Sequence, residues 1–175
     1  HKWMLAPHGI GFLWIDPAKR ERIIPTDVGA YSNDRYELPT AFSYFPTAQR
    51  FEAGTQDETK AAGLAAAIAF LKEVGMKDIA EHGFGLARFL NHAIRAMPQM
   101  EVLSPLNPLL ASAITTFRPR NGQTRTLYNH LMSHGFRVRS VSEANLNAIR
   151  ISTHIYNHID ECINLLDTLQ EFLAS

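Results

Sequence analysis

The sequence predicts a mixed α/β fold, and three stretches of the chain carry this prediction. Residues 9–15 form a short apolar run between turn residues, which is typical of a buried strand. Residues 55–97 follow helical periodicity almost without interruption. Residues 148–152 alternate between apolar and polar side chains, as a half-buried strand does. The C-terminal half is therefore predicted to be a small α/β sandwich in which helices cover a sheet.

The composition excludes several classes of protein. The chain has 175 residues, with 17 Lys and Arg balanced by 17 Asp and Glu, and one cysteine. The balanced charge argues against a nucleic-acid partner, and one cysteine excludes a disulfide framework. No apolar run approaches the ~20 residues that a membrane span needs. We expect a cytoplasmic globular protein without a membrane partner and, because it opens on His1-Lys2 without an initiator methionine, a fragment.

The N-terminal region combines one predicted strand with a long irregular segment. The apolar run of residues 9–15 follows the turn residues Pro7-His8-Gly9 and is closed by Asp16-Pro17. Residues 24–50 show no clear period and contain several prolines and scattered aromatic residues. In a compact domain such a stretch is usually functional or covered by a partner.

Two adjoining helices are predicted in the middle of the chain. Capping-type residues at 55–58 start the first helix and Gly75 ends it, while the second runs over residues 77–97 and ends at Pro98. Their apolar stripes are Leu64, Ile68, Leu71 and Val74 in the first helix, and Ile79, Leu86, Leu90, Ala93 and Met97 in the second. Because almost no linker separates them, we expect one long bent helix of the kind that often joins two domains.

Short elements follow in the C-terminal half. Strands are predicted at 110–117, 136–139 and 148–152, with a turn at 118–122 and a helix over 123–134 that ends at Gly135. Asn157 is predicted to cap a final helix, with Asp160 three residues later imitating a capping box. The apolar stripe of that helix is expected to contain Ile159, Ile163, Leu166 and Leu173.

Lys2 is the first candidate for chemistry. It stands beside Trp3 and shortly before the predicted buried strand, where poor hydration would favour a neutral, nucleophilic amine. An enzyme needs such an amine to form a Schiff base with a carbonyl cofactor. By position alone, a fully solvated lysine at a chain end is the simpler interpretation.

Three motifs in order change that interpretation through resemblance. They are His1-Lys2-Trp3 with Pro7-x-Gly9-x-Gly11, then Arg50-Phe51-Glu52-Ala53-Gly54-Thr55, then Ala148-Ile149-Arg150-Ile151-Ser152 with Tyr156-Asn157. Together they resemble the class V aminotransferase family of pyridoxal-phosphate enzymes, which includes cysteine desulfurases and isopenicillin N epimerase-like proteins. Only residues 16–49 and 98–122 match poorly. The resemblance implies a fold-type I enzyme, with residues 1–85 ending the large domain and 86–175 forming the small C-terminal domain.

The resemblance also implies roles for particular residues. Lys2 would form the Schiff base with pyridoxal 5'-phosphate and move the substrate Cα proton, while His1 would lie against the cofactor phosphate. Gly54 and Thr55 would reach the cofactor phosphate of a neighbouring subunit from a helix start, where free amides favour an anion. This arrangement implies a homodimer with composite active sites. From the sequence alone, a plain helix cap is the favoured interpretation of Thr55, and the two roles do not exclude each other.

Two arginines are candidates for the substrate site. Arg150 alternates with Ile149 and Ile151, so it faces away from the core, and a guanidinium fork suits a carboxylate. The resemblance implies that Arg150 binds the α-carboxylate of an amino acid, and Arg139 is predicted to support it. A solvated strand face is the alternative for Arg150, and Arg137, on the same face as Arg139, weakens the signal there.

Departures from the family pattern narrow the chemistry. Cysteine desulfurases carry a nucleophilic cysteine in the loop that here is Ser142-Glu143-Ala144-Asn145, while the one thiol, Cys162, is predicted to be a core residue. A persulfide-forming desulfurase is therefore disfavoured. The pairs His130/His134 and His154/His158 have a spacing that suits a metal, but no glutamate stands beside His130, so no metal site is predicted.

The sequence thus predicts a pyridoxal-phosphate-dependent enzyme of the class V type that acts on an amino acid. A cysteine or selenocysteine lyase that works without a persulfide cysteine is the alternative within the enzymes. A non-catalytic dimerising remnant of the fold is the alternative outside them. In the family, several cofactor ligands precede the lysine, so we expect the 175 residues alone to bind the cofactor poorly. The sequence does not distinguish transamination, epimerisation and C–S bond cleavage.

Overall fold

A computed structural model describes residues 1–37 and 39–174. The chain divides into two compact units, His1–Leu71 and Lys72–Ser175, and each is described here by itself. The assignment of residues 1–85 to a large domain and 86–175 to a small one stays a prediction. Among the described residues, no helix has both the length and the apolar character to cross a lipid bilayer.

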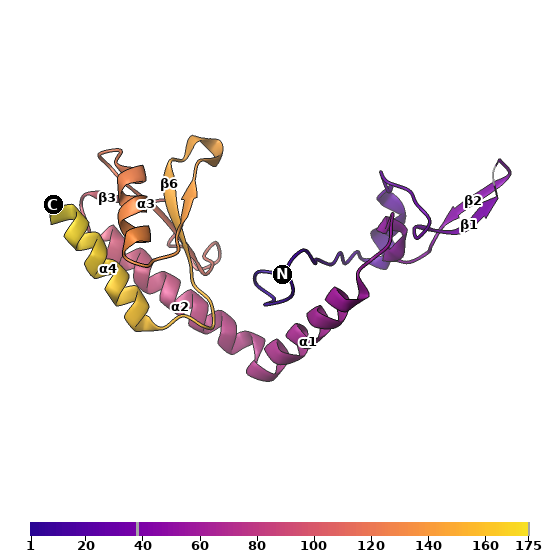
Figure 1. The fold of residues 1–175 in the computed structure, drawn as a ribbon, viewed down its shortest axis with the longest axis horizontal. Helices are drawn as coiled ribbons and strands as arrows, with labels where there is room; N and C mark the ends of the chain where they lie inside the picture. Colours follow the sequence, from indigo (N-terminus) through magenta and orange to yellow (C-terminus); the bar gives the residue numbers. More distant parts are fainter. Residues whose placement is uncertain (38, 175) are drawn as a thin grey trace. The chain divides into compact units, whose positions relative to one another are not determined.

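The N-terminal unit contains a β-hairpin where the sequence predicts irregular chain. Strands β1 (Asn33–Glu37) and β2 (Ala41–Tyr44) pair antiparallel, and both are labelled in Figure 1. Two short 3-10 helices flank the hairpin, η1 (Pro17–Arg22) and η2 (Ala48–Phe51). The strands are short and mostly exposed, so they lack the apolar alternation that would reveal them in the sequence.

The strand predicted at residues 9–15 is not present. The segment has no regular secondary structure, and Phe12, Leu13 and Trp14 are 69%, 59% and 76% exposed. A strand requires a neighbour that accepts and donates its backbone hydrogen bonds, and no strand within residues 1–37 and 39–174 pairs with this segment. The prediction of a buried strand is therefore wrong in conformation and in the burial of these three side chains, and only Ile15 of the run is buried.

Two helices rather than one bent helix occupy the middle of the chain. Helix α1 spans Glu58–Val74 and α2 spans Met76–Arg95. Gly75 separates them with a φ of 99°, in a region that residues other than glycine rarely adopt and that no α-helix can contain. On α2 the predicted stripe is confirmed, because Ile79, Leu86 and Leu90 are buried.

The C-terminal unit is the predicted sandwich of helices on a sheet. Its four antiparallel strands are β3 (Met100–Val102), β4 (Ile114–Pro119), β5 (Arg139–Val141) and β6 (Ala148–Ser152), in the order β3-β4-β6-β5. Helices α2 and α3 (Thr124–Ser133) pack against the sheet, and α4 (Ile159–Ala174) packs against α2 and α3 (Figure 1). The shared core contains Leu90 and Ile94 of α2, Phe117 of β4, Leu127 and Leu131 of α3, Ile149 of β6, and Leu165 and Leu169 of α4.

Two predicted strands begin later than the sequence indicates. Residues 110–113 precede β4, because the amide of Leu110 donates back to the carbonyl of Asn107 in a turn. Residues 136–138 precede β5, since the amide of Phe136 donates to the carbonyl of Leu131 and closes the end of α3. In both places local turn hydrogen bonds occupy amides that a strand would use for pairing.

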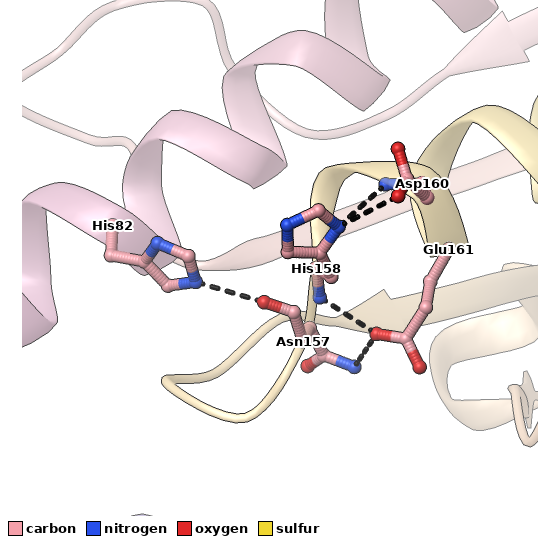
Figure 2. Close-up of polar contacts among 5 residues, drawn as sticks. All are labelled: His82, Asn157, His158, Asp160 and Glu161. Atoms are coloured by element: carbon pink, nitrogen blue, oxygen red, sulfur yellow. Dashed lines mark hydrogen bonds and ion pairs between the residues drawn. The ribbon is translucent and has the colours of Figure 1, made fainter.

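The start of α4 differs by one residue from its predicted cap. His158, not Asn157, is the cap residue: the carboxylate of Glu161 accepts from the His158 amide at 2.8 Å, as in a capping box (Figure 2). The Asn157 side chain instead accepts from the amide of His154 and donates to Glu161. The buried stripe shifts accordingly to Cys162, Leu165, Leu166 and Leu169, and Ile159 and Ile163 are exposed.

Candidate functional site

Lys2 lies in a tight turn at the beginning of the chain. The amide of Ala6 donates to the carbonyl of His1 at 3.0 Å, and that of Leu5 donates to the carbonyl of Lys2 at 3.3 Å. The Lys2 side chain is exposed, so the poor hydration expected from a following buried strand is not found. Its amine is accessible to a carbonyl compound.

The Lys2 turn is followed by a segment that packs on helix α1. Gly63 of α1 faces the ring of Pro7 so closely that a Cβ atom at position 63 would overlap it. The imidazole rings of His1 and His8 lie 5.4 Å apart between centroids, on either side of the turn. The absence of a side chain at Gly63 therefore sets how near the lysine segment comes to the helix.

Gly54 and Thr55 are predicted to lie at the start of a helix, but the structure places them before it. Helix α1 begins at Glu58, and Asp57 caps it by accepting from the amide of Thr59 at 3.1 Å. The hydrogen bond from the Thr59 hydroxyl is the largest of the interactions that lower the pKa of the Asp57 carboxyl. Because Asp57 takes the helix amides, an anion at this end would have to use the loop at 54–55 itself.

The loop that contains Gly54 and Thr55 offers such donors. Both residues are exposed, and no hydrogen bond within residues 1–37 and 39–174 engages their amides or the Thr55 hydroxyl. Nor does any hydrogen bond or ion pair in this described part of the chain join Lys2 to either residue. The amides of Gly54 and Thr55 and the Thr55 hydroxyl are therefore available to a ligand that is not bound to Lys2 of the same chain.

Two residues that support this loop had no predicted role. Arg50 is buried, pairs with Glu21 at 2.9 Å and lies 5.2 Å from the ring centroid of Tyr44. Gly29 approaches the carbonyl of Ala53 so closely that a Cβ atom at position 29 would overlap it. Arg50 belongs to a quoted motif, but its ion pair with the exposed Glu21 and the close approach of Gly29 to Ala53 depend on chain segments distant in sequence.

Arg150 occupies the face of the sheet opposite the core, as its alternation predicts. Ile149 and Ile151 are buried under the helices, while Arg150 is half-buried and lies opposite Thr116 of β4. Its Nε atom is buried and has no hydrogen-bond partner among the residues described. A buried, unpaired guanidinium nitrogen is costly, so this position favours an anionic acceptor.

Arg139 lies directly opposite Arg150 on β5. It forms an ion pair with Glu143, a residue of the loop that follows β5. The backbone amide of Glu143 and the Arg139 guanidinium lower the pKa of the Glu143 carboxyl. Since Glu143 already neutralises Arg139, Arg150 is the arginine of this pair with unsatisfied hydrogen-bonding capacity.

The remaining predicted residue, Cys162, is buried in α4 as expected. It is 4% exposed, and burial, followed by the charge of Glu161, raises the pKa of its thiol. A thiol with a raised pKa is a poor nucleophile at neutral pH. The 142–145 loop, by contrast, offers a carboxylate and a hydroxyl but no sulfur.

The fold defines the class of protein. An apo cysteine desulfurase from Thermococcus onnurineus superposes with a TM-score of 0.82 at 24% identity, over 97% of this chain and 44% of that one. A structure of a protein called C-DES, with glycine linked covalently to its PLP cofactor, gives a TM-score of 0.79 over 97% of this chain and 43% of that one, also at 24% identity. The fold is that of fold-type I pyridoxal-phosphate enzymes.

The sequence comparisons identify the family. The profile of the family described as Aminotransferase class-V matches residues 1–165, and the chain therefore belongs to that family, which confirms the resemblance drawn from the motifs. An isopenicillin N epimerase from Amycolatopsis lactamdurans is 28% identical over 98% of this chain and 45% of its own length. A probable cysteine desulfurase from Pyrococcus abyssi is 25% identical over 100% and 45%. The chain thus spans less than half the length of these relatives.

Proposed function

We propose that this protein is a pyridoxal-phosphate-dependent enzyme that acts on an amino acid. Membership of the aminotransferase class-V family supports the cofactor. The observation that carries the substrate class is the buried Nε of Arg150, which lacks an acceptor in the described part of the chain. A carboxylate would supply that acceptor through two parallel charge-assisted hydrogen bonds.

The residues of the N-terminal unit fit the cofactor in their chemistry. The Lys2 amine is exposed, His1 is adjacent to it, and the loop of Gly54 and Thr55 presents donors with no partner among the described residues. When bound, pyridoxal phosphate supplies an aldehyde that condenses with amines and a ring that accepts the electrons of a broken Cα bond. Lys2 would hold the aldehyde of the cofactor. The backbone amides of Gly54 and Thr55 and the Thr55 hydroxyl would hold a cofactor phosphate.

In this proposal Lys2 and Arg150 act on different groups of the substrate. Arg150 binds and orients the α-carboxylate, which fixes the direction of the Cα–H bond. Lys2, once its amine is free again, accepts the Cα proton and can return it. Arg139 supports the site by holding Glu143, so that the loop after β5 stays close to the end of the sheet.

The proposal includes a homodimer with composite sites. Among the described residues, no hydrogen bond joins Gly54 or Thr55 to Lys2. The backbone amides of the two residues and the Thr55 hydroxyl belong to exposed residues. Such donors suit the cofactor phosphate of a second copy of the chain. Mixing a Lys2→Ala chain with a Thr55→Ala chain would then restore part of the activity in heterodimers.

A C–S lyase is the second candidate. Cysteine desulfurases are among the relatives, and one protein of similar structure is a cystine C–S lyase, solved in complex with its product, cysteine persulfide. Cys162 is buried and its thiol pKa is raised, so the chain lacks an exposed cysteine to carry a persulfide. A panel of amino acids that scores sulfide release against keto-acid formation and racemisation separates these reactions.

An absorbance spectrum tests the cofactor. The intact protein, incubated with pyridoxal phosphate, should develop a yellow chromophore that borohydride reduces, with a mass increase located on Lys2 by peptide mapping. Lys2→Arg should prevent both, whereas Lys19→Arg, at another exposed lysine, should prevent neither. A protein that stays colourless but forms a dimer would instead indicate a dimerising remnant of the fold.

A further inference from the structure

A cluster of metal-ligating side chains lies between helices α3 and α4, apart from every residue assigned above. An imidazole nitrogen of His130, one of His134 and a carboxylate oxygen of Glu171 all lie within 4.8 Å of one another. His130 and His134 are four residues apart at the end of α3, and Glu171 comes from the last turn of α4. The packing of the two helices brings the third ligand to the pair.

The environment of His134 orients its free nitrogen. Nδ1 of His134 lies 2.8 Å from the backbone carbonyl oxygen of His130 and 3.3 Å from the hydroxyl of Ser133. A carbonyl oxygen only accepts, so Nδ1 carries the proton in this contact and Nε2 of the neutral ring keeps its lone pair. Metal-binding histidines are typically held in this way, by a backbone carbonyl on the nitrogen away from the metal.

His130 contributes a second, independent observation. Its Nε2 atom is buried and has no hydrogen-bond partner among the residues that the structure describes. The ring lies against Phe172, 5.4 Å between centroids, and 4.2 Å from the ring of His134. A buried nitrogen without a partner costs free energy, and a bound cation at this position would remove that cost.

Glu171 completes a set of two nitrogens and one oxygen. It is exposed and forms no ion pair with any described residue. Two histidines and one glutamate form the ligand set of zinc sites that keep one position open for water. In a tetrahedral site neighbouring ligand atoms lie about 3.3 Å apart. Rotation of the exposed Glu171 side chain would bring its carboxylate oxygen closer to both imidazole nitrogens while His134 keeps its hydrogen bond to the His130 carbonyl.

We propose that His130, His134 and Glu171 form a binding site for a divalent transition metal of the zinc type, with one open coordination position. The site would link α3 to α4 and stabilise the C-terminal unit by mass action, because the unfolded chain does not hold the three ligands together. The site involves none of the residues proposed to bind pyridoxal phosphate or the substrate. Its test is therefore independent of the proposed enzymatic function.

A metal titration of the intact protein tests the site. After removal of metal with a chelator, Zn²⁺ should bind by calorimetry with one ion per chain, and Co²⁺ should produce visible absorption bands typical of four-coordinate cobalt. His134→Gln and Glu171→Gln should each weaken Zn²⁺ binding about tenfold or more, because each removes one of three ligands. At the same Zn²⁺ concentration, the thermal midpoint of the wild-type protein should rise more than that of either variant.

Matched controls make the result decisive. His92→Gln removes an exposed histidine from α2, outside the cluster, and should leave Zn²⁺ affinity unchanged. Lys2→Ala should also leave it unchanged, which separates metal binding from the cofactor. Circular dichroism verifies that each variant is folded. Absence of stoichiometric binding to the wild-type protein, or equal affinity in folded His134→Gln or Glu171→Gln, would overturn the proposal.

Discussion

Arg139 of β5 and Arg150 of β6 are direct cross-strand partners, so their side chains leave the same face of the sheet. Like charges at such a pair destabilise it unless negative charge compensates them. Glu143 compensates Arg139, whereas the Nε of Arg150 is buried without a partner among the described residues. The register of two short strands thus creates a position suited to a carboxylate.

Replacement of Arg150 should weaken binding of the amino acid more than replacement of Arg139. Arg150→Lys keeps the charge but removes the fork, and we expect KM to rise about 10- to 100-fold, which corresponds to the ~1.5–3 kcal/mol of a charged hydrogen bond. Arg139→Lys should change KM less, because its partner is Glu143. Arg120→Lys, at an exposed turn, is the control. Steady-state kinetics with an unchanged KM in Arg150→Lys would contradict the assignment.

A matched pair of glycine substitutions tests the packing of the lysine segment. Gly85→Ala in α2 meets no atom within 4 Å and should stabilise the protein by about 0.5–1 kcal/mol through helix propensity. Gly63→Ala in α1 collides with Pro7, so the same gain should be cancelled and the protein destabilised by about 1–2 kcal/mol. Urea unfolding measures both changes. Equal stabilisation by the two substitutions would show that Pro7 does not pack on Gly63.

The cap of α4 should make stability depend on pH in the acid range. The amide of His158, and then the side chain of Asn157, lower the pKa of Glu161 from its ordinary value of 4.5 (Figure 2). A lowered folded-state pKa stabilises the fold fully above pH 4.5, and this contribution is lost as the pH falls through the lower folded value.

Glu161→Gln keeps an acceptor for the cap but does not titrate. The wild-type protein should therefore lose stability relative to Glu161→Gln when the pH falls below 4.5, and the difference should be constant above pH 6. Asp167→Asn, which removes a carboxylate from α4 without touching the cap, controls for net charge. Thermal midpoints between pH 3 and 7 measure the effect, and parallel curves for the wild type and Glu161→Gln would refute it.

Cys162 should behave as a packing residue. The thiol is 4% exposed and burial raises its pKa, so it should react with a disulfide reagent much more slowly in the native protein than in denaturant. Cys162→Ala should cost about 1 kcal/mol of stability by leaving a small cavity, with turnover on an amino acid retained. Loss of turnover in a folded Cys162→Ala protein would indicate a catalytic thiol instead.

The helices and one strand were accessible from sequence because their signals are local. Apolar periodicity and the stop at Gly75 predicted α1 and α2, and the alternation around Arg150 predicted both β6 and the face on which that side chain lies. The family motifs likewise depend on the order of residues along the chain. Sequence therefore determined the fold class, the family and the candidate lysine and arginine.

Tertiary structure decided what depends on pairing between distant segments. The run at residues 9–15 is apolar, but a strand exists only where another strand hydrogen-bonds to it. The 33–44 hairpin, the register that pairs Arg139 with Arg150, and the approach of Glu171 to His130 all come from contacts between segments far apart in sequence. Local patterns specify local hydrogen bonds and burial, and these contacts form only when the whole chain packs.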